Sequence, residues 1–123
     1  MSEYKMGMVE SQFAELIWDN EPISTKQLII LSEEKFNWKR TTTYTVLKRL
    51  CERGIFNTEN SIVTSIVSKN DFYAIQSENF IDDTFKGSLP AFLNAFSSRK
   101  SLTKDEINVI QNIINKYKEE NHE

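Results

Sequence analysis

The sequence predicts a mainly α chain (α+β), with an N-terminal winged helix-turn-helix, a small β-hairpin wing and a C-terminal helical region. Three observations predict it: three short amphipathic helices in succession, two β-rich runs directly after them, and helical periodicity again up to the C-terminal end. The 123 residues, 39% hydrophobic and 27% charged, suit a folded chain with a hydrophobic core. We expect a winged-helix DNA-binding domain over residues 1–68 and a helical dimerisation domain over residues 69–123.

The first two helices follow from apolar spacing and from the residues at their ends. One helical stripe on the first helix is made of Val9, Phe13, Leu16 and Ile17. Asn20-Glu21-Pro22 ends that helix. Ser24 and Gln27 have the spacing of a capping box, so a second helix is expected to begin there. Asn37 ends this second apolar run.

A third helix and a hairpin complete the predicted winged helix. The helix spans about Arg40 to Arg53, and Gly54 stands where a left-handed C-terminal cap is favoured. Its inward stripe consists of Thr43, Val46, Leu47 and Leu50. Residues 55–58 form a first predicted strand, 59–61 a turn, and the β-branched run 62–67 a second strand.

The C-terminal half reads as three further helices. Helical spacing returns from Lys69 to Phe85, and Gly87-Ser88 breaks it. Pro90 suits the first turn of a short helix, after which residues 97–101 form a polar connector. The last helix begins with the capping box of residues 103–106.

The outward face of the third helix has the composition of a nucleic-acid contact. Between Lys35 and Arg53, six basic residues stand against one acid, a local charge of +5 in a chain of net charge −3. A helix of this kind fits the DNA major groove, so we expect double-stranded DNA as a partner. A solvated helix face is the alternative explanation of the charge. The expected DNA-binding residues are Lys39, Arg40, Thr41, Thr42, Tyr44, Thr45, Lys48 and Arg49.

Each expected contact has a chemical role. Arg40 can form paired hydrogen bonds to a guanine, and threonine methyl groups can pack on a thymine methyl. Lys39, Lys48 and Arg49 are expected at phosphates, where they set register and affinity without reading sequence. The alternative is that the threonine hydroxyls only cap the helix and that Tyr44 is a half-buried core residue.

The last 50 or so residues carry more apolar side chains than three short helices can bury among themselves. A partner subunit is the simplest cover for them, and packing against the winged helix of the same chain is the alternative. A two-fold dimer would also match a symmetric operator. The expected dimerisation residues are Phe80, Phe85, Leu89, Phe92, Leu93, Phe96, Ile107, Ile110 and Ile114.

Enzymatic and membrane functions find no support in the sequence. Cys51 is the only cysteine and His122 the only histidine, so we expect no catalytic residue, metal ion or cofactor. No apolar run reaches the length of about 18 residues that a membrane span needs. The N-terminus has no basic start followed by an apolar run, so a cytoplasmic location without membrane insertion is expected.

Several segments resemble the penicillinase repressor family of the BlaI/MecI type, in order along the chain. They are Phe13–Trp18, Trp38–Leu50 followed by Glu52-Arg53-Gly54, Glu78–Ile81, Lys86–Leu89 and Leu102–Ile107. The resemblance implies a homodimeric winged-helix repressor on an inverted-repeat operator that controls β-lactamase or related antibiotic-resistance genes. It also implies release through a membrane sensor protease pathway, with cleavage in the dimerisation region at the bond between Ala95 and Phe96.

Three departures from the family pattern matter. Ala95 stands where the family usually has asparagine before the cleaved bond, although Asn94 is adjacent. The tail from Lys116 lacks the paired cysteines of copper-responsive relatives. The run 61–67 lacks the basic and tyrosine residues often found in the wing. The alternative function is therefore a winged-helix protein-interaction module that does not read DNA sequence, and a duplex affinity that falls steeply with salt would distinguish the two.

Overall fold

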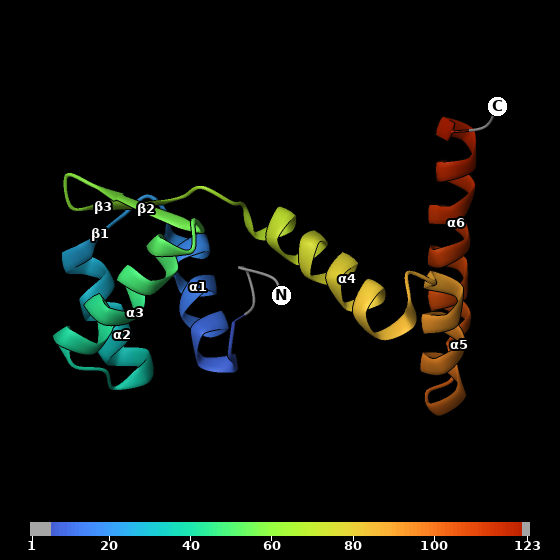
Figure 1. Ribbon diagram of the computed structural model, residues 1–123, viewed down its shortest axis with the longest axis horizontal. Coiled ribbons are helices and arrows are strands. Elements are labelled where there is room, and N and C mark those ends of the chain that lie inside the picture. The colour runs from blue at the N-terminus through green and yellow to red at the C-terminus, as the bar shows by residue number, and fades with distance from the viewer. Residues whose placement is uncertain (1–5, 122–123) are drawn as a thin grey trace. The chain divides into compact units, whose positions relative to one another are not determined.

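The computed structural model describes residues 6–121, so His122 lies outside the described residues. The elements are, in order, α1 (Met8–Asn20), β1 (Ile23–Ser24), α2 (Thr25–Phe36), α3 (Arg40–Glu52), β2 (Phe56–Glu59), β3 (Ile62–Ser65), α4 (Lys69–Phe85), α5 (Leu89–Arg99) and α6 (Lys104–Asn121). This is a mainly helical chain with a winged helix at its N-terminal end, as predicted (Figure 1). Among residues 6–121, no helix combines the length and the apolar character needed to cross a membrane.

The winged helix packs α1, α2 and α3 against a small antiparallel sheet (Figure 1). Phe13 and Ile17 of α1, Leu28 of α2, Leu50 of α3 and Val63 of β3 are each fully buried in its core. Burial of one such side chain stabilises the fold by about 1.5–3 kcal/mol. Because the buried residues come from every element of the unit, this core fixes the position of α3.

Two ends of the core helices behave as their residues predict. Ser24 caps α2, because its hydroxyl accepts a hydrogen bond from the Gln27 amide at 3.0 Å. Asn37 ends α2 in the left-handed region with φ of 58°, a conformation that asparagine tolerates better than most residues. Val9 differs from the prediction: it is 52% exposed, because the α1 stripe reaches the core only from Phe13 onward.

The wing is the hairpin of β2 and β3. It belongs to a three-stranded sheet with the strand order β1-β3-β2. Glu59 pairs with Ile62, and the two residues between them, Asn60 and Ser61, both have positive φ (54° and 62°). Such a two-residue turn matches the twist of the flanking strands. Strand β2 begins at Phe56 rather than at Ile55, where the sequence predicted its start. The Ile55 carbonyl instead accepts hydrogen bonds from the amides of residues 66 and 67.

The two-residue strand β1 was not predicted from the sequence. Ile23 pairs with Val63 and Ser24 with Ile62. The segment is too short for an alternating pattern, and it forms because the core already brings the start of α2 beside β3. The pairing extends the hairpin into a three-stranded sheet.

The chain divides into two compact units, of which the first ends at Phe80 and the second begins at Ile81. The first unit extends beyond the wing because Phe72 of α4 is buried in the winged-helix core. The separation of roles between residues 1–68 and 69–123 stays a prediction.

The second unit contains the end of α4 with α5 and α6. Ser88 caps α5 by accepting a hydrogen bond from the Ala91 amide at 3.1 Å, with Pro90 in the first turn. Thr103 and Glu106 form the predicted capping box of α6, with reciprocal hydrogen bonds of 2.9 and 3.0 Å. The predicted connector from residue 97 is shorter than expected, since α5 continues to Arg99 and the hydroxyls of its last serines bond to its own carbonyls.

Candidate nucleic-acid interface

Helix α3 is held by one face and leaves the other in solvent. Thr43, Val46, Leu47 and Leu50 are buried, as predicted for the inward stripe. Hydrogen bonds within the helix fix two of its threonines: the hydroxyl of Thr43 donates to the Lys39 carbonyl (3.4 Å) and that of Thr45 to the Thr41 carbonyl (2.9 Å). The Thr43 bond and its burial give this residue the packing role expected for it.

Every residue predicted to contact DNA is solvent-exposed. The exposed set comprises Lys39, Arg40, Thr41, Thr42, Tyr44, Thr45, Lys48 and Arg49. Tyr44 is 40% exposed, which excludes a fully buried role, and the Arg40 guanidinium carbon lies 5.7 Å from the centre of its ring. This cation–π contact holds the Arg40 side chain against the helix surface. Threonine, tyrosine and cationic groups thus share one accessible helix face.

The chain matches the model of the penicillinase repressor family over residues 6–116. The chain belongs to the penicillinase repressor family. It is 28% identical over 117 residues to the methicillin resistance regulatory protein MecI of Staphylococcus aureus, covering 92% of this chain and 95% of that protein. It is 24% identical over 113 residues to the penicillinase repressor of Bacillus licheniformis, covering 89% and 88% of the two chains.

Membership of the penicillinase repressor family agrees with the fold and the outward face of α3. The family consists of transcription regulators that bind operator DNA through a winged helix, and its members are not enzymes. The family therefore accounts for the accessible face of α3. Which residues of this repressor contact DNA stays a prediction.

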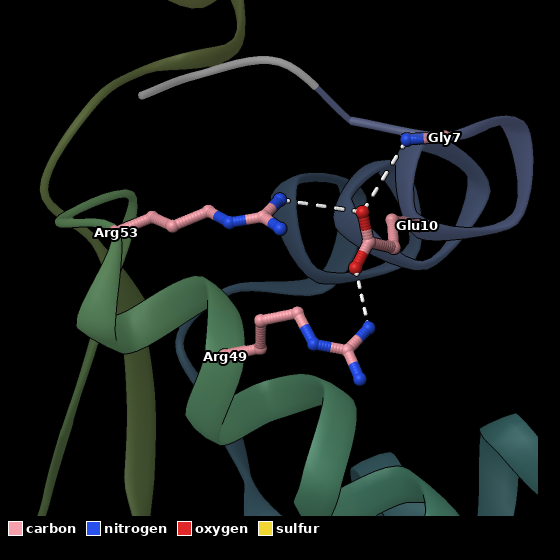
Figure 2. Close-up of polar contacts among 4 residues, drawn as sticks. All are labelled: Gly7, Glu10, Arg49 and Arg53. Carbon is pink, nitrogen blue, oxygen red and sulfur yellow. Dashed lines mark hydrogen bonds and ion pairs between the residues drawn. The ribbon is translucent and has the colours of Figure 1, made fainter. Parts of the chain in front are cut away.

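Two arginines of the repressor, one in the last turn of α3 and one at its C-cap, share an acidic partner within the chain. Figure 2 shows Glu10 of α1 between Arg49 and Arg53, with its carboxylate at 2.6 Å from Arg49 and 3.3 Å from Arg53. The Gly7 amide donates a third hydrogen bond to Glu10 at 3.3 Å. The contacts tie the end of α3 to the start of α1, and they partly neutralise the positive charge of Arg49. Sequence reasoning missed this, because the partners lie 39 residues apart without any shared motif.

We expect Glu10→Gln to lower the free energy of unfolding by about 1 kcal/mol at pH 7, because the exposed arginines limit what the ion pairs contribute. The hydrogen bond from Arg49 is the main cause that lowers the pKa of Glu10 from its usual 4.5. A lowered pKa stabilises the fold above the unfolded value and ceases to do so as pH falls through the folded value. The difference between wild type and variant in urea unfolding should therefore shrink as pH falls below about 4.5.

The matched control is Glu34→Gln, which removes an exposed carboxylate on α2. It should change stability by less than about 0.5 kcal/mol at any pH. A pH-independent effect of Glu10→Gln would mean that the charge of Glu10 contributes nothing to the fold.

The repressor's α4 is fastened to α1 by a second polar cluster. The Tyr73 hydroxyl donates a hydrogen bond to Glu15 at 2.8 Å, and the Lys69 ammonium lies 3.3 Å from the same carboxylate. Burial, followed by the hydrogen bond to Glu15, raises the pKa of Tyr73 to about 12. The Trp18 indole also donates to the Val67 carbonyl at 3.0 Å. These contacts hold the first turn of α4 and the segment before it against α1.

The residues predicted for dimerisation divide by exposure within the single chain. Phe80, Leu89, Phe96, Ile107 and Ile114 are between 45 and 58% exposed. Helix α6, which carries Ile107 and Ile114, has three further exposed apolar residues that were not in the predicted set: Val109, Ile113 and Tyr117. The half-buried members of the predicted set are Phe85, Phe92, Leu93 and Ile110.

The half-buried phenylalanines form ring contacts inside the second unit. The rings of Phe85 and Phe92 pack edge to face, with their centres 5.7 Å apart. The ring centres of Phe92 and Phe96 are 6.1 Å apart. Among the described residues of α5 and α6, none is fully buried. The apolar side chains of this unit therefore lack a complete cover within the unit itself.

Proposed function

We propose that this chain is a homodimeric transcriptional repressor that binds an inverted-repeat operator and controls β-lactamase or related resistance genes. The accessible face of α3 is the observation that carries the proposal. It presents polar and cationic side chains from a helix whose other side is locked in the core. The regulated genes are inferred from the relatives, which are named as a methicillin resistance regulatory protein and a penicillinase repressor.

The proposed contacts follow the order of side chains along α3. Its N-terminal half would meet base edges, with Arg40 at a guanine and the threonines at neighbouring bases. Lys39 and Lys48 would neutralise phosphates and set the register. Arg49 takes a smaller part in this scheme than the sequence indicates, because Glu10 already holds it.

The proposed dimer is supported by apolar surface that the second unit does not cover by itself. Leu89 of α5 is 58% exposed, and Ile114 of α6 is 48% exposed. Burial stabilises an interface by about 25 cal/mol per Å² of apolar area. Packing of these helices against a second copy would therefore stabilise the dimer by several kcal/mol. Two-fold symmetry would place two copies of α3 on half-sites about one helical turn apart.

The remaining part of the proposal is that proteolysis in the cytoplasm releases the repressor from DNA. A membrane sensor pathway would trigger this cleavage. The bond between Ala95 and Phe96 lies inside α5, where both residues are exposed. Ser98 bonds back to the Ala95 carbonyl at 2.8 Å, so a protease would have to unwind this turn first. Access to the bond would then depend on local opening of α5.

The test is the salt dependence of duplex binding. Wild type should lose affinity steeply as salt rises, because phosphate contacts release counterions. Lys48→Ala should weaken binding to every duplex to a similar degree and reduce the slope of log K against log[salt] by about one unit. Fluorescence anisotropy with labelled duplexes at several salt concentrations measures both quantities.

Lys118→Ala is the matched control, since it removes another exposed cation, which lies on α6. It should leave the slope unchanged. A wild-type chain without salt-dependent duplex binding would instead favour the protein-interaction module, whose third helix contacts another protein.

A further inference from the structure

A groove lies beside the proposed base-reading half of α3. It has a volume of about 490 Å³ and is bounded by the starts of α2 and α3 and by the hairpin turn. The Thr25 amide donates a hydrogen bond to the Ser61 carbonyl at 2.9 Å, which ties the turn to α2. The groove is therefore built by the fold and does not depend on one mobile side chain.

The groove combines apolar and cationic side chains. Ile29, Ile30 and Tyr44 supply its apolar surface, while Lys26 and Arg40 supply positive charge. Ile30 is 43% exposed and Tyr44 is 40% exposed, so both side chains are accessible to an occupant of the groove. Among the described residues that line the groove, none is acidic. An occupant with an apolar group next to negative charge fits this arrangement.

The thymine 5-methyl group has that chemistry. It is the one apolar group that a base pair presents in the major groove, and phosphates flank it on both sides. We infer that Ile30 and Tyr44 form an apolar ledge that reads a thymine methyl, so that α2 as well as α3 determines operator sequence. The inference rests on the proposed function.

The Arg40–Tyr44 contact supports a ledge rather than a loose pair of side chains. With its guanidinium carbon 5.7 Å from the ring centre, Arg40 restrains one side of Tyr44. Ile30 belongs to a different helix, and its neighbour Ile29 is half-buried. A restrained apolar surface loses little conformational entropy on binding, which favours discrimination between bases that differ by one methyl group.

The experiment uses duplexes that the full chain enriches from a random-sequence library. Each thymine is then replaced in turn by deoxyuridine, which removes only the 5-methyl group. We expect one thymine per half-site at which this change weakens wild-type binding about fourfold, the equivalent of one buried methyl group. Ile30→Ala should lose that sensitivity and bind the thymine and deoxyuridine duplexes equally.

Three further variants separate the ledge from general effects on folding. Ile30→Val and Tyr44→Phe keep most of the apolar surface and should retain the sensitivity at least in part. Ile66→Ala removes an isoleucine that is 62% exposed and does not line the groove, so it should retain the sensitivity in full. Thermal unfolding of each variant shows whether the fold is intact.

The outcomes are distinct. A duplex that binds with a steep salt dependence but has no methyl-sensitive thymine would overturn the ledge and leave the proposed function standing. Unchanged methyl sensitivity in Ile30→Ala would assign the contact to another side chain and also overturn it. Failure to enrich any duplex would overturn the proposed function and the ledge together.

Discussion

Phe96→Asp is expected to convert the proposed dimer to monomers at concentrations where we expect wild type to be dimeric. Phe96 is 45% exposed and lies outside the buried core, so the substitution removes surface of the proposed interface while sparing the core of the winged helix. Loss of a buried phenylalanine, with a carboxylate in its place, should weaken dimerisation by about 3 kcal/mol or more, roughly a hundredfold. Sedimentation velocity over a dilution series measures the change in mass.

The same substitution should reduce binding to a two-half-site duplex far more than binding to a single half-site. When two half-sites are bound by one dimer, the second contact is effectively intramolecular and adds about 10²–10⁴ in affinity. Loss of the dimer removes that factor and leaves α3 itself intact. Binding of both duplexes by Phe96→Asp can be compared in one titration.

Asn94→Asp is the control on the same helix. It introduces a negative charge two residues before Phe96, where Asn94 is exposed and contributes no apolar surface. This variant should remain dimeric. If Phe96→Asp had the mass of wild type at every dilution, the exposed face of α5 would not be the dimer interface.

The helices of the winged helix could be predicted because their local signals agree with their tertiary roles. Leu50 is buried and Lys48 exposed, as the helical periodicity around them requires. Gly54 adopts φ of 80° after the last turn of α3, the conformation for which glycine is favoured at a helix end. At such positions propensity, pattern and capping all favour the same structure.

The features that could not be predicted depend on contacts between distant segments. Strand β1 has two residues and forms only because β3 lies beside it. The bond between Tyr73 and Glu15 joins residues 58 positions apart, and no local pattern marks either as a partner. The first compact unit extends into α4 for the same reason, since Phe72 looks like any other apolar residue of a helix.

The candidate interface shows the same division within a single helix. Exposure of Arg40 and Tyr44 follows from the position of the inward stripe, so the sequence suffices to place them. The pairing of Arg49 with Glu10 depends on where α1 packs, so a count of basic residues overstates the charge available to DNA. The groove beside Ile30 likewise needs two helices and a turn to be placed together.

Arg40→Ala should reduce affinity for the selected operator duplex by about 1–3 kcal/mol, roughly five- to 150-fold, and affinity for a scrambled duplex much less. The reason is that a guanidinium paired with a guanine edge gains two directed hydrogen bonds, whereas its contribution on an arbitrary sequence is only that of one charge near phosphates. Competition of labelled operator with unlabelled operator and scrambled duplexes measures the ratio of the two affinities. That ratio should fall with the loss of Arg40.

Arg40→Lys separates charge from geometry, because lysine keeps the positive charge but lacks the planar pair of donors. The lysine variant should bind scrambled duplexes like wild type and should still lose most of the preference for operator. The stacking of Arg40 on Tyr44 predicts one further consequence: Tyr44→Phe keeps the ring and should preserve the preference. Equal losses on operator and scrambled duplexes in Arg40→Ala, with full recovery in Arg40→Lys, would mean that this residue contacts a phosphate and that the preference for operator arises elsewhere on the face of α3.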